Sequence, residues 1–243
     1  MRLNQFIAKS GFSSRRKADL FIKEGKVRVN KRVIFEPYFE VKEKDKVTID
    51  SRVLRLEKCV YLIFNKPEGV TTTLKDRFAH KKVSDFIPKN LGRLYPVGRL
   101  DKNSKGLLIL TNDGSLCYEL THPKFEVEKE YIAWVKGDFN KSLLIKLKKG
   151  VNSGGEILKV KSISIETKGD DRTSLKVVIR EGKKRHLRRL FAGLGFFVLE
   201  LKRVRIGDLR LGNLEEGSFK IVSKESIYRL TRNFRAADAN SCV

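Results

Sequence analysis

The chain has 243 residues, of which 40% are hydrophobic and 34% charged, a balance that excludes a disordered polymer and predicts folded domains. Lysines and arginines number 53 against 29 aspartates and glutamates, so the formal net charge is +24. A surplus of that size repels itself in a compact fold. A polyanionic partner such as nucleic acid is therefore its simplest explanation, with a general solubility bias as the alternative.

Residues 1–57 are predicted to form a compact basic module. The stretch RLNQFIAKSG has apolar residues at helical spacing and ends at Gly11. The next stretch, SSRRKADLFIKEG, predicts a second helix that Ser13 or Ser14 caps. After it, KVRVNKRVIF alternates and turns at Asn30-Lys31, which indicates a β-hairpin, and DKVTID supplies another short strand.

The first turn of the second helix carries three cations, Arg15, Arg16 and Lys17. The helix macrodipole disfavours cations there, whereas cations beside exposed first-turn amides would bind a phosphate well. A solvated charge cluster is the alternative reading. The stretch from Arg2 to Val33 resembles the S4-type RNA-binding domain, above all in SRRKAD followed by GKVRVN. The resemblance implies docking on RNA, with Arg15, Arg16, Lys17 and Lys26 as phosphate contacts.

A second domain is expected over residues 58–232, after a join at 51–59. Short β-rich runs alternate there irregularly with helical patterns near 115–121, 140–149 and 184–194. This order predicts an α+β domain with a mixed, largely antiparallel sheet. Residues 233–243 are expected to be a disordered tail.

One carboxylate, Asp101, stands out in the segment GRLDKNSKGLLILTND, residues 98–113. Gly98 and Gly106 permit sharp turns, LLILT predicts a buried strand, and Asn112 or Asp113 is suited to cap a helix. Asp101 is therefore expected on a loop held between ordered elements, where neighbouring cations favour its ionised form. Such a carboxylate serves as nucleophile or general base, and a turn aspartate in a surface salt bridge is the alternative.

The same segment resembles the signature of pseudouridine synthases, in the branch that modifies small- and large-subunit ribosomal RNA. The matching pattern is Gly-Arg-Leu-Asp, two residues, a hydroxyl residue, one residue, Gly, four apolar residues and a hydroxyl residue. HPKFEVEKEY is most similar to the large-subunit synthase B type, which implies a 23S rRNA target, with a small-subunit rRNA target as the alternative. Further segments similar to the family are YLIFNKPEGVTTT (61–73), YPVG (95–98), HPKFEVEKEYIAWV (122–135) and the stretch 180–217.

The resemblance implies that Asp101 is the nucleophile that isomerises a uridine to pseudouridine, once the base has left its helical stack. Whether it attacks the sugar or the base stays open. Tyr131 is expected to present its ring to the base. The basic partner of Asp101 is expected to be Lys183, with Arg185 as second choice, although lysine lacks the bidentate fork of arginine.

Other residues of this domain are expected to contact RNA or the base. Arg99, Arg185 and Arg188 are candidate RNA contacts, and Leu199 and Leu201 are candidate walls of a uracil pocket, with core packing as the alternative. His186 is expected to be neutral and structural among its basic neighbours. The competing function is a non-catalytic basic rRNA-binding protein or ribosome assembly factor.

The three cysteines, Cys59, Cys117 and Cys242, include no short-spaced pair, which disfavours disulfides and zinc and favours a reducing compartment. No apolar run suits a signal peptide or a membrane span. We therefore expect a cytoplasmic monomer that needs no metal or cofactor. Its expected partner is ribosomal RNA or a pre-ribosomal particle, not a membrane.

Overall fold

The computed structural model describes residues 1–74, 76 and 78–229. They form two compact units, Met1–Cys59 with Lys89–Leu94, and Val60–Pro88 with the chain from Tyr95 onward. The tail predicted at 233–243 lies outside the described residues. None of the helices in the described part combines the length and apolarity that crossing a bilayer requires.

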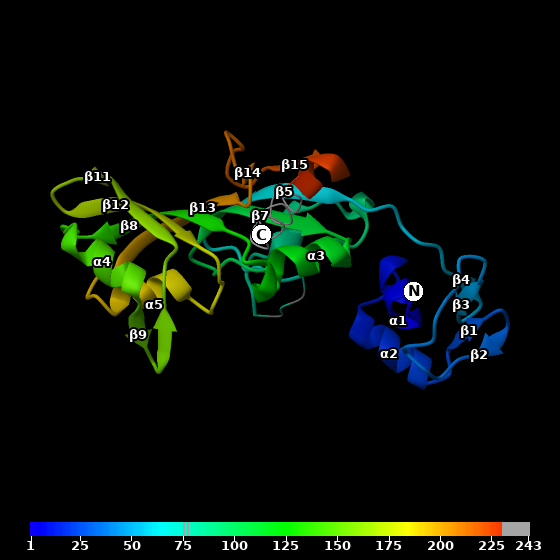
Figure 1. The fold of residues 1–243 in the computed structure, drawn as a ribbon. Helices are drawn as coiled ribbons and strands as arrows, with labels where there is room; N and C mark the ends of the chain where they lie inside the picture. Colours follow the sequence, from blue (N-terminus) through cyan, green and yellow to red (C-terminus); the bar gives the residue numbers. More distant parts are fainter. Residues whose placement is uncertain (75, 77, 230–243) are drawn as a thin grey trace. The chain divides into compact units, whose positions relative to one another are not determined.

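The N-terminal unit packs two helices against a four-stranded antiparallel sheet of order β2-β1-β3-β4 (Figure 1). The Ser14 hydroxyl accepts a hydrogen bond from the Lys17 amide and so caps the second helix. Asn30 and Lys31 have φ of 50° and 73°, the left-handed pair that a tight hairpin needs. The predicted helices, hairpin and further strand are confirmed, with bounds α1 Leu3–Lys9, α2 Arg15–Lys23, β1 Val27–Val29, β2 Arg32–Val33, β3 Val47–Ile49 and β4 Arg52–Val53.

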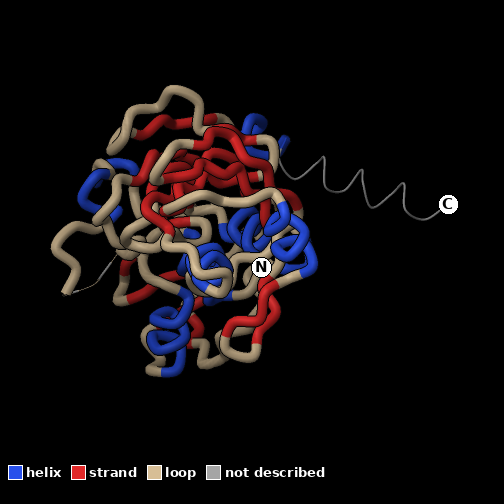
Figure 2. The backbone as a smooth tube through the Cα atoms, turned by 90° about the vertical axis from the view of Figure 1, so that its left-hand side faces the viewer, coloured by secondary structure: helices blue, strands red, loops and turns tan. Residues whose placement is uncertain are grey.

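The larger unit is built on a nine-stranded sheet (Figures 1 and 2). Its central order is β11-β12-β8-β13-β7-β5-β15, with β14 beside β13 and β6 beside β7. Every pair is antiparallel except β13 with β7, so the predicted mixed, largely antiparallel sheet is confirmed. The strands are β5 Tyr61–Lys66, β6 Tyr95–Pro96, β7 Lys105–Thr111, β8 Lys129–Lys136, β11 Ser162–Lys168, β12 Arg172–Ile179, β13 Val198–Ile206, β14 Leu209–Arg210 and β15 Phe219–Val222. A separate hairpin pairs β9 Val151–Ser153 with β10 Glu156–Leu158.

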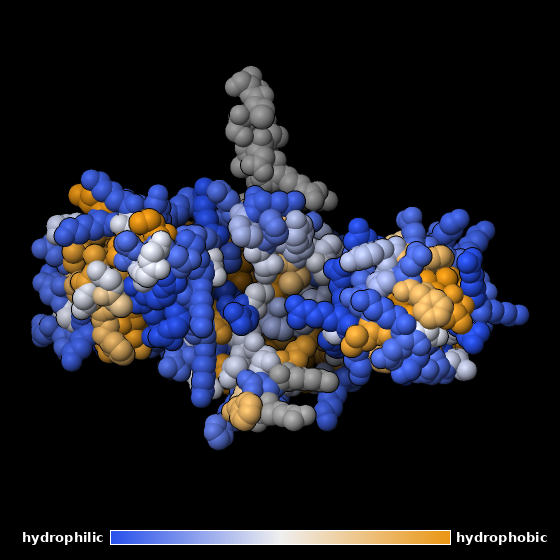
Figure 3. Space-filling model, turned by 90° about the horizontal axis from the view of Figure 1, so that it is seen from below, coloured by the Kyte–Doolittle hydropathy of each residue, from blue (hydrophilic) through white to orange (hydrophobic). Residues whose placement is uncertain are grey.

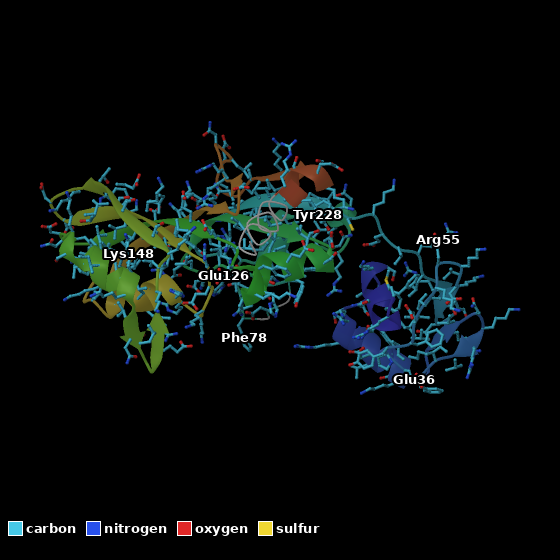
Figure 4. The ribbon with its side chains drawn as sticks, in the orientation of Figure 1. Glu36, Arg55, Phe78, Glu126, Lys148 and Tyr228 are labelled. Carbon is cyan, nitrogen blue, oxygen red and sulfur yellow. The ribbon has the colours of Figure 1, made fainter. Side chains whose placement is uncertain are left out.

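Helices α3 and α5 lie below the sheet in the view of Figure 1. Asp113 caps α3, because its Oδ1 accepts from the amides of Ser115 and Leu116 at 3.0 and 3.3 Å. The phenols of Tyr61 and Tyr228, the latter labelled in Figure 4, both donate to Asp113 Oδ2 at 2.9 Å. The three predicted helices are confirmed as α3 Gly114–Thr121, α4 Ser142–Lys149 and α5 His186–Ala192, and the 3₁₀ turns are η1 Val83–Phe86, η2 Lys89–Leu91 and η3 Pro123–Phe125.

The parallel contact between β7 and β13 depends on Gly106. This residue pairs with Arg203 and has φ of 102°. A Cβ there would lie 2.3 Å from the Arg203 carbonyl oxygen, so no larger residue fits. Because Arg203 also pairs with Tyr131 across β13 and β8, this contact brings the loop before β7 beside the tyrosine strand.

Candidate active site

The loop that carries Asp101 borders a cavity of about 460 Å³ in the larger unit. Asp101 is half-buried, and Tyr131, Lys183, Arg185 and Leu201 line the same cavity. Figure 3 views the molecule from below, and hydrophilic side chains predominate around the middle of the larger unit on that face. Residues far apart in the sequence thus line one cavity: 71–72, 98–102 with Ser104, Thr121, Tyr131, Ile179, 182–187 and Leu201.

Hydrogen bonds from the turn after β5 and from α5 hold the backbone on both sides of Asp101. The Thr72 hydroxyl donates to the Leu100 carbonyl at 2.7 Å. The Gly69 amide donates to the Lys102 carbonyl at 2.9 Å. Arg188 Nη2 donates to the Asn103 carbonyl at 2.5 Å. The loop is therefore fixed before any substrate binds, which is what a positioned carboxylate requires.

Lys66, the last residue of β5, is fully buried beneath this loop. Its ammonium donates to the carbonyls of Pro67, Val70 and Lys102 at 2.8, 2.7 and 3.3 Å. Burial lowers its pKa to about 8, and nearby negative charges, that of Asp101 among them, offset part of this effect. Lys66 thus joins the end of β5 to the loop and adds positive charge near the carboxylate.

We expect Lys66→Met to destabilise the protein in a pH-dependent way. Between about pH 8 and its ordinary pKa of 10.5, folded Lys66 has released its proton while unfolded Lys66 still holds it. The free energy of unfolding of the wild type should therefore rise with pH across that window relative to the variant. Urea unfolding at pH 7.5 and pH 10 measures the difference, with exposed Lys102→Met as control. A difference in the free energy of unfolding between wild type and Lys66→Met that stays constant with pH would contradict this role.

Tyr131 lies on β8 and is only 7% exposed. Its phenol oxygen is 3.5 Å from Arg203 Nη1, which donates to it. The apolar residues Ile179 and Leu201 line the same cavity. An aromatic ring with apolar neighbours suits a flat nucleobase, and the phenol adds one polar group.

The predicted partners of Asp101 differ in what they contact. Lys183 Nζ lies 3.4 Å from Glu181 and donates to the Ile157 carbonyl, and no ion pair joins Lys183 to Asp101 among the described residues. Arg185, with φ of 52°, is exposed at the start of α5. Arg188 on α5 donates to the Val198 and Asn103 carbonyls. Burial and the charge of Arg185 lower the pKa of Arg188, and the negative charge of Asp101 opposes them.

The remaining predicted residues of this domain take different places. Arg99 is exposed and lines the cavity, as Leu201 does from a buried position. Leu199 is not among the lining residues and is 41% exposed. A β-bulge between Val198 and Glu200 explains the difference, because the extra residue breaks the alternation along β13. His186 is buried with Nε2 3.0 Å from the Lys159 carbonyl oxygen, and burial lowers its pKa.

In the N-terminal unit the predicted phosphate contacts are all exposed. Arg15, Arg16 and Lys17 form the first turn of α2. Lys26 pairs with Glu24 at 2.7 Å, which raises its pKa. The first three cations have no carboxylate within ion-pair distance among the described residues, so they are free to meet an anion.

Several residues at the site carry no sequence signal that separates them from ordinary ones. Lys66 and Thr72 lie inside the quoted stretch 61–73, yet a lysine at a strand end reads as a surface residue. Arg203 and Lys129 stand in β-rich runs, and only the pairing of β13 with β8 brings Arg203 to Tyr131.

Comparisons with known proteins show the family of the chain. The family model described as RNA pseudouridylate synthase matches residues 60–193, and the S4 domain model matches residues 1–47. The chain is 38% identical over 231 residues to the ribosomal large subunit pseudouridine synthase B of Bacillus subtilis, which covers 94% of this chain and 95% of that protein. It is 34% identical over 232 residues to an RNA pseudouridine synthase of Aquifex aeolicus, covering 95% and 93% of the two chains.

A solved structure of a pseudouridylate synthase shares the fold of this chain. A crystal structure of a pseudouridylate synthase superposes with a TM-score of 0.66 at 28% identity and covers 95% of this chain and 99% of that one. Both the sequence relatives and this structure span nearly the whole chain. The chain therefore belongs to the RNA pseudouridylate synthase family.

Proposed function

We propose that this enzyme isomerises a uridine of ribosomal RNA to pseudouridine, with Asp101 as its nucleophile. The bond between N1 of uracil and C1′ of ribose breaks, a bond between C5 and C1′ forms, C5 loses its proton and N1 gains one. The observation that carries the proposal is the meeting of Asp101 and Tyr131 at one cavity of a pseudouridine synthase fold. Such a carboxylate is able to attack either the sugar carbon or the base ring.

The target base has to leave its stack before it reaches Asp101. The cavity suits an extruded uracil, since Tyr131 and Leu201 offer apolar surface and Asp101 stands at the wall. Exposed Arg99 and Arg185 at its rim suit the flanking phosphates. Extrusion of the base into this cavity is thus part of the proposed mechanism.

Within the proposed site, we infer that Arg188 is the cation of the 180–189 segment that holds the Asp101 loop in place, in addition to Lys66 from β5. Lys183 and Arg185, the first and second choices from the sequence, remain the alternatives. The hydrogen bond from Arg188 to the Asn103 carbonyl and the influence of the Asp101 charge on Arg188 support this choice.

Ribosomal RNA, and 23S rRNA in particular, is the proposed substrate. The similarity to the Bacillus subtilis large-subunit enzyme supports it. Action as a cytoplasmic monomer on rRNA or a pre-ribosomal particle belongs to the same proposal. The test is release of tritium from rRNA labelled at C5 of uridine, followed by carbodiimide mapping and primer extension in a deletion strain. No tritium release by the wild type would favour a non-catalytic assembly factor.

The N-terminal unit is the proposed docking module. Replacing Arg15, Arg16 and Lys17 together with alanine should weaken rRNA binding. It should also flatten the dependence of log affinity on log salt by up to about 0.7–0.9 for each lost phosphate contact. Titrations at several salt concentrations measure this. The control removes equal charge from α4 with Lys146→Ala, Lys148→Ala and Lys149→Ala (Lys148 is labelled in Figure 4). An unchanged slope in the α2 variant would refute the docking assignment.

A further inference from the structure

A second cavity of about 310 Å³ lies beside the proposed uracil cavity in the larger unit. The two cavities have six lining residues in common, which means that they share one wall: Gly98, Arg99, Thr121, Tyr131, Gly182 and Lys183. Groups bound in the two cavities would therefore both contact this wall, which includes Tyr131.

Arg203 lines this second cavity and is 3% exposed. Its Nε donates to the Leu107 carbonyl at 2.8 Å and its Nη1 to the Tyr131 phenol at 3.5 Å, whereas Nη2 has no hydrogen-bond partner. No carboxylate lies within 4 Å of its guanidinium in the described part of the chain. A buried cation with neither a counter-ion nor a full set of acceptors costs free energy.

A second cation, Lys129, lines the same cavity. Its Nζ donates to the Val127 carbonyl at 2.9 Å and forms no ion pair with the described carboxylates. Burial lowers the pKa of Lys129 to about 8, and the positive charge of Arg203 contributes. Two cations thus line one cavity, and neither forms an ion pair with a described carboxylate; Glu181, the acid in the lining, lies 3.4 Å from Lys183.

Two other cations of the second cavity, unlike Lys129 and Arg203, have carboxylate partners. Arg180 pairs with Glu126 at 2.8 Å, and Glu126 is labelled in Figure 4. Lys183 lies 3.4 Å from Glu181. The unmatched positive charge is therefore concentrated on Lys129 and Arg203, with exposed Arg99 at the shared wall.

We propose that the second cavity binds a phosphate group of the substrate RNA next to the target uridine, between Lys129 and Arg203. This inference rests on the proposed function, because a uridine held against Tyr131 carries its own phosphodiesters to within one nucleotide of the shared wall. A phosphate supplies the negative charge and the acceptors that these two residues lack. Because Arg203 donates to the Tyr131 phenol, a phosphate bound to Arg203 would also help to orient Tyr131. Binding of the RNA backbone would then be coupled to placement of the base.

The test combines a variant of Lys129 with a charge-neutral RNA linkage. Lys129→Met removes the charge and keeps the length, and Lys129→Arg should restore function. In an rRNA oligonucleotide, a methylphosphonate replaces in turn each phosphate that flanks the mapped uridine. At one position the neutral linkage should lower wild-type kcat/KM by roughly 10- to 100-fold, the effect of losing a charge-assisted hydrogen bond. The same linkage should lower the kcat/KM of Lys129→Met little further, because this variant already lacks the ammonium that would contact the phosphate.

A second readout does not depend on turnover. The affinity of Lys129→Met for an rRNA fragment should depend less on salt than that of the wild type, by about 0.7–0.9 in log–log slope. Lys136→Met, an exposed lysine at the other end of β8, is the matched control and should leave the slope unchanged. If the wild type converts no uridine, the proposed function fails, while the slope still tests the phosphate site.

Two results would overturn the inference. One is a slope and a methylphosphonate effect that are the same in the wild type and in Lys129→Met. The other is a site that binds only free anions. In that case inorganic phosphate raises the melting temperature of the wild type but not of Lys129→Met, while the methylphosphonate and salt experiments on RNA show no dependence on Lys129.

Discussion

Asp101→Asn is expected to abolish conversion of uridine to pseudouridine while fold and RNA affinity are retained. The carboxamide has the size of the carboxylate but no anionic oxygen to attack the nucleotide. The acceptors of the hydrogen bonds that fix the loop are the backbone carbonyls of Leu100, Lys102 and Asn103. None of these bonds involves the Asp101 side chain. The variant should therefore fold normally. Loss of a nucleophile lowers the rate by roughly 10⁴- to 10⁶-fold.

Tritium release under single-turnover conditions measures the chemical step of Asp101→Asn, and filter binding measures its affinity for the same RNA. Asp138→Asn is the matched control, because Asp138 is exposed and pairs with Lys168. It should leave both quantities unchanged. Residual conversion by Asp101→Asn within tenfold of the wild type would rule out a nucleophilic role for Asp101.

Arg188→Met is expected to cause the second largest loss, about 10²- to 10³-fold in kcat, and a larger one than Lys183→Met. Arg188 joins α5 to the loop by donating to the Asn103 carbonyl, and the negative charge of Asp101 acts to raise the pKa of Arg188. The Lys183 ammonium is engaged by Glu181 and the Ile157 carbonyl instead. Because the loop must hold the carboxylate to within a fraction of an ångström, loosening it costs rate even where binding survives.

Single-turnover rates of Arg188→Met, Arg188→Lys and Lys183→Met settle this order. Arg188→Lys keeps a charge but not the planar fork, so it should recover only part of the rate. A greater loss in Lys183→Met than in Arg188→Met would restore the pairing of Lys183 with Asp101 that the sequence suggests. Thermal melting of each variant separates a loosened loop from a failure to fold.

Features encoded over a few residues were predictable from the sequence. The caps fall on one of the two candidates offered at each helix start, Ser14 and Asp113, and the left-handed turn falls at Asn30-Lys31 as predicted. The loop around Asp101 was also recognisable, because its glycines and apolar strand form a long fixed pattern. Local chemistry thus placed the main helices and the central carboxylate.

Features that depend on distant strands were not predictable in this way. Arg203 meets Tyr131 only through the register of β13 on β8, and that register changes at bulges. The bulge beside Leu199 turns its side chain outward, although two-residue spacing groups it with Leu201. The burial of Lys66 is not predictable from the sequence either, because the three carbonyls that make it favourable come from loops that the sequence does not place.

The proposed reaction requires a uracil to leave its helix and enter the cavity between Asp101 and Tyr131. A crystal structure of Asp101→Asn bound to an rRNA fragment that contains the mapped uridine would show where that uracil lies. We predict that this uracil lies against the Tyr131 ring, with its sugar C1′ or ring C6 roughly 3–3.5 Å from the carboxamide that replaces the Asp101 carboxylate. A bound RNA whose target uridine remains stacked, or lies outside this cavity, would contradict extrusion of the base to Asp101.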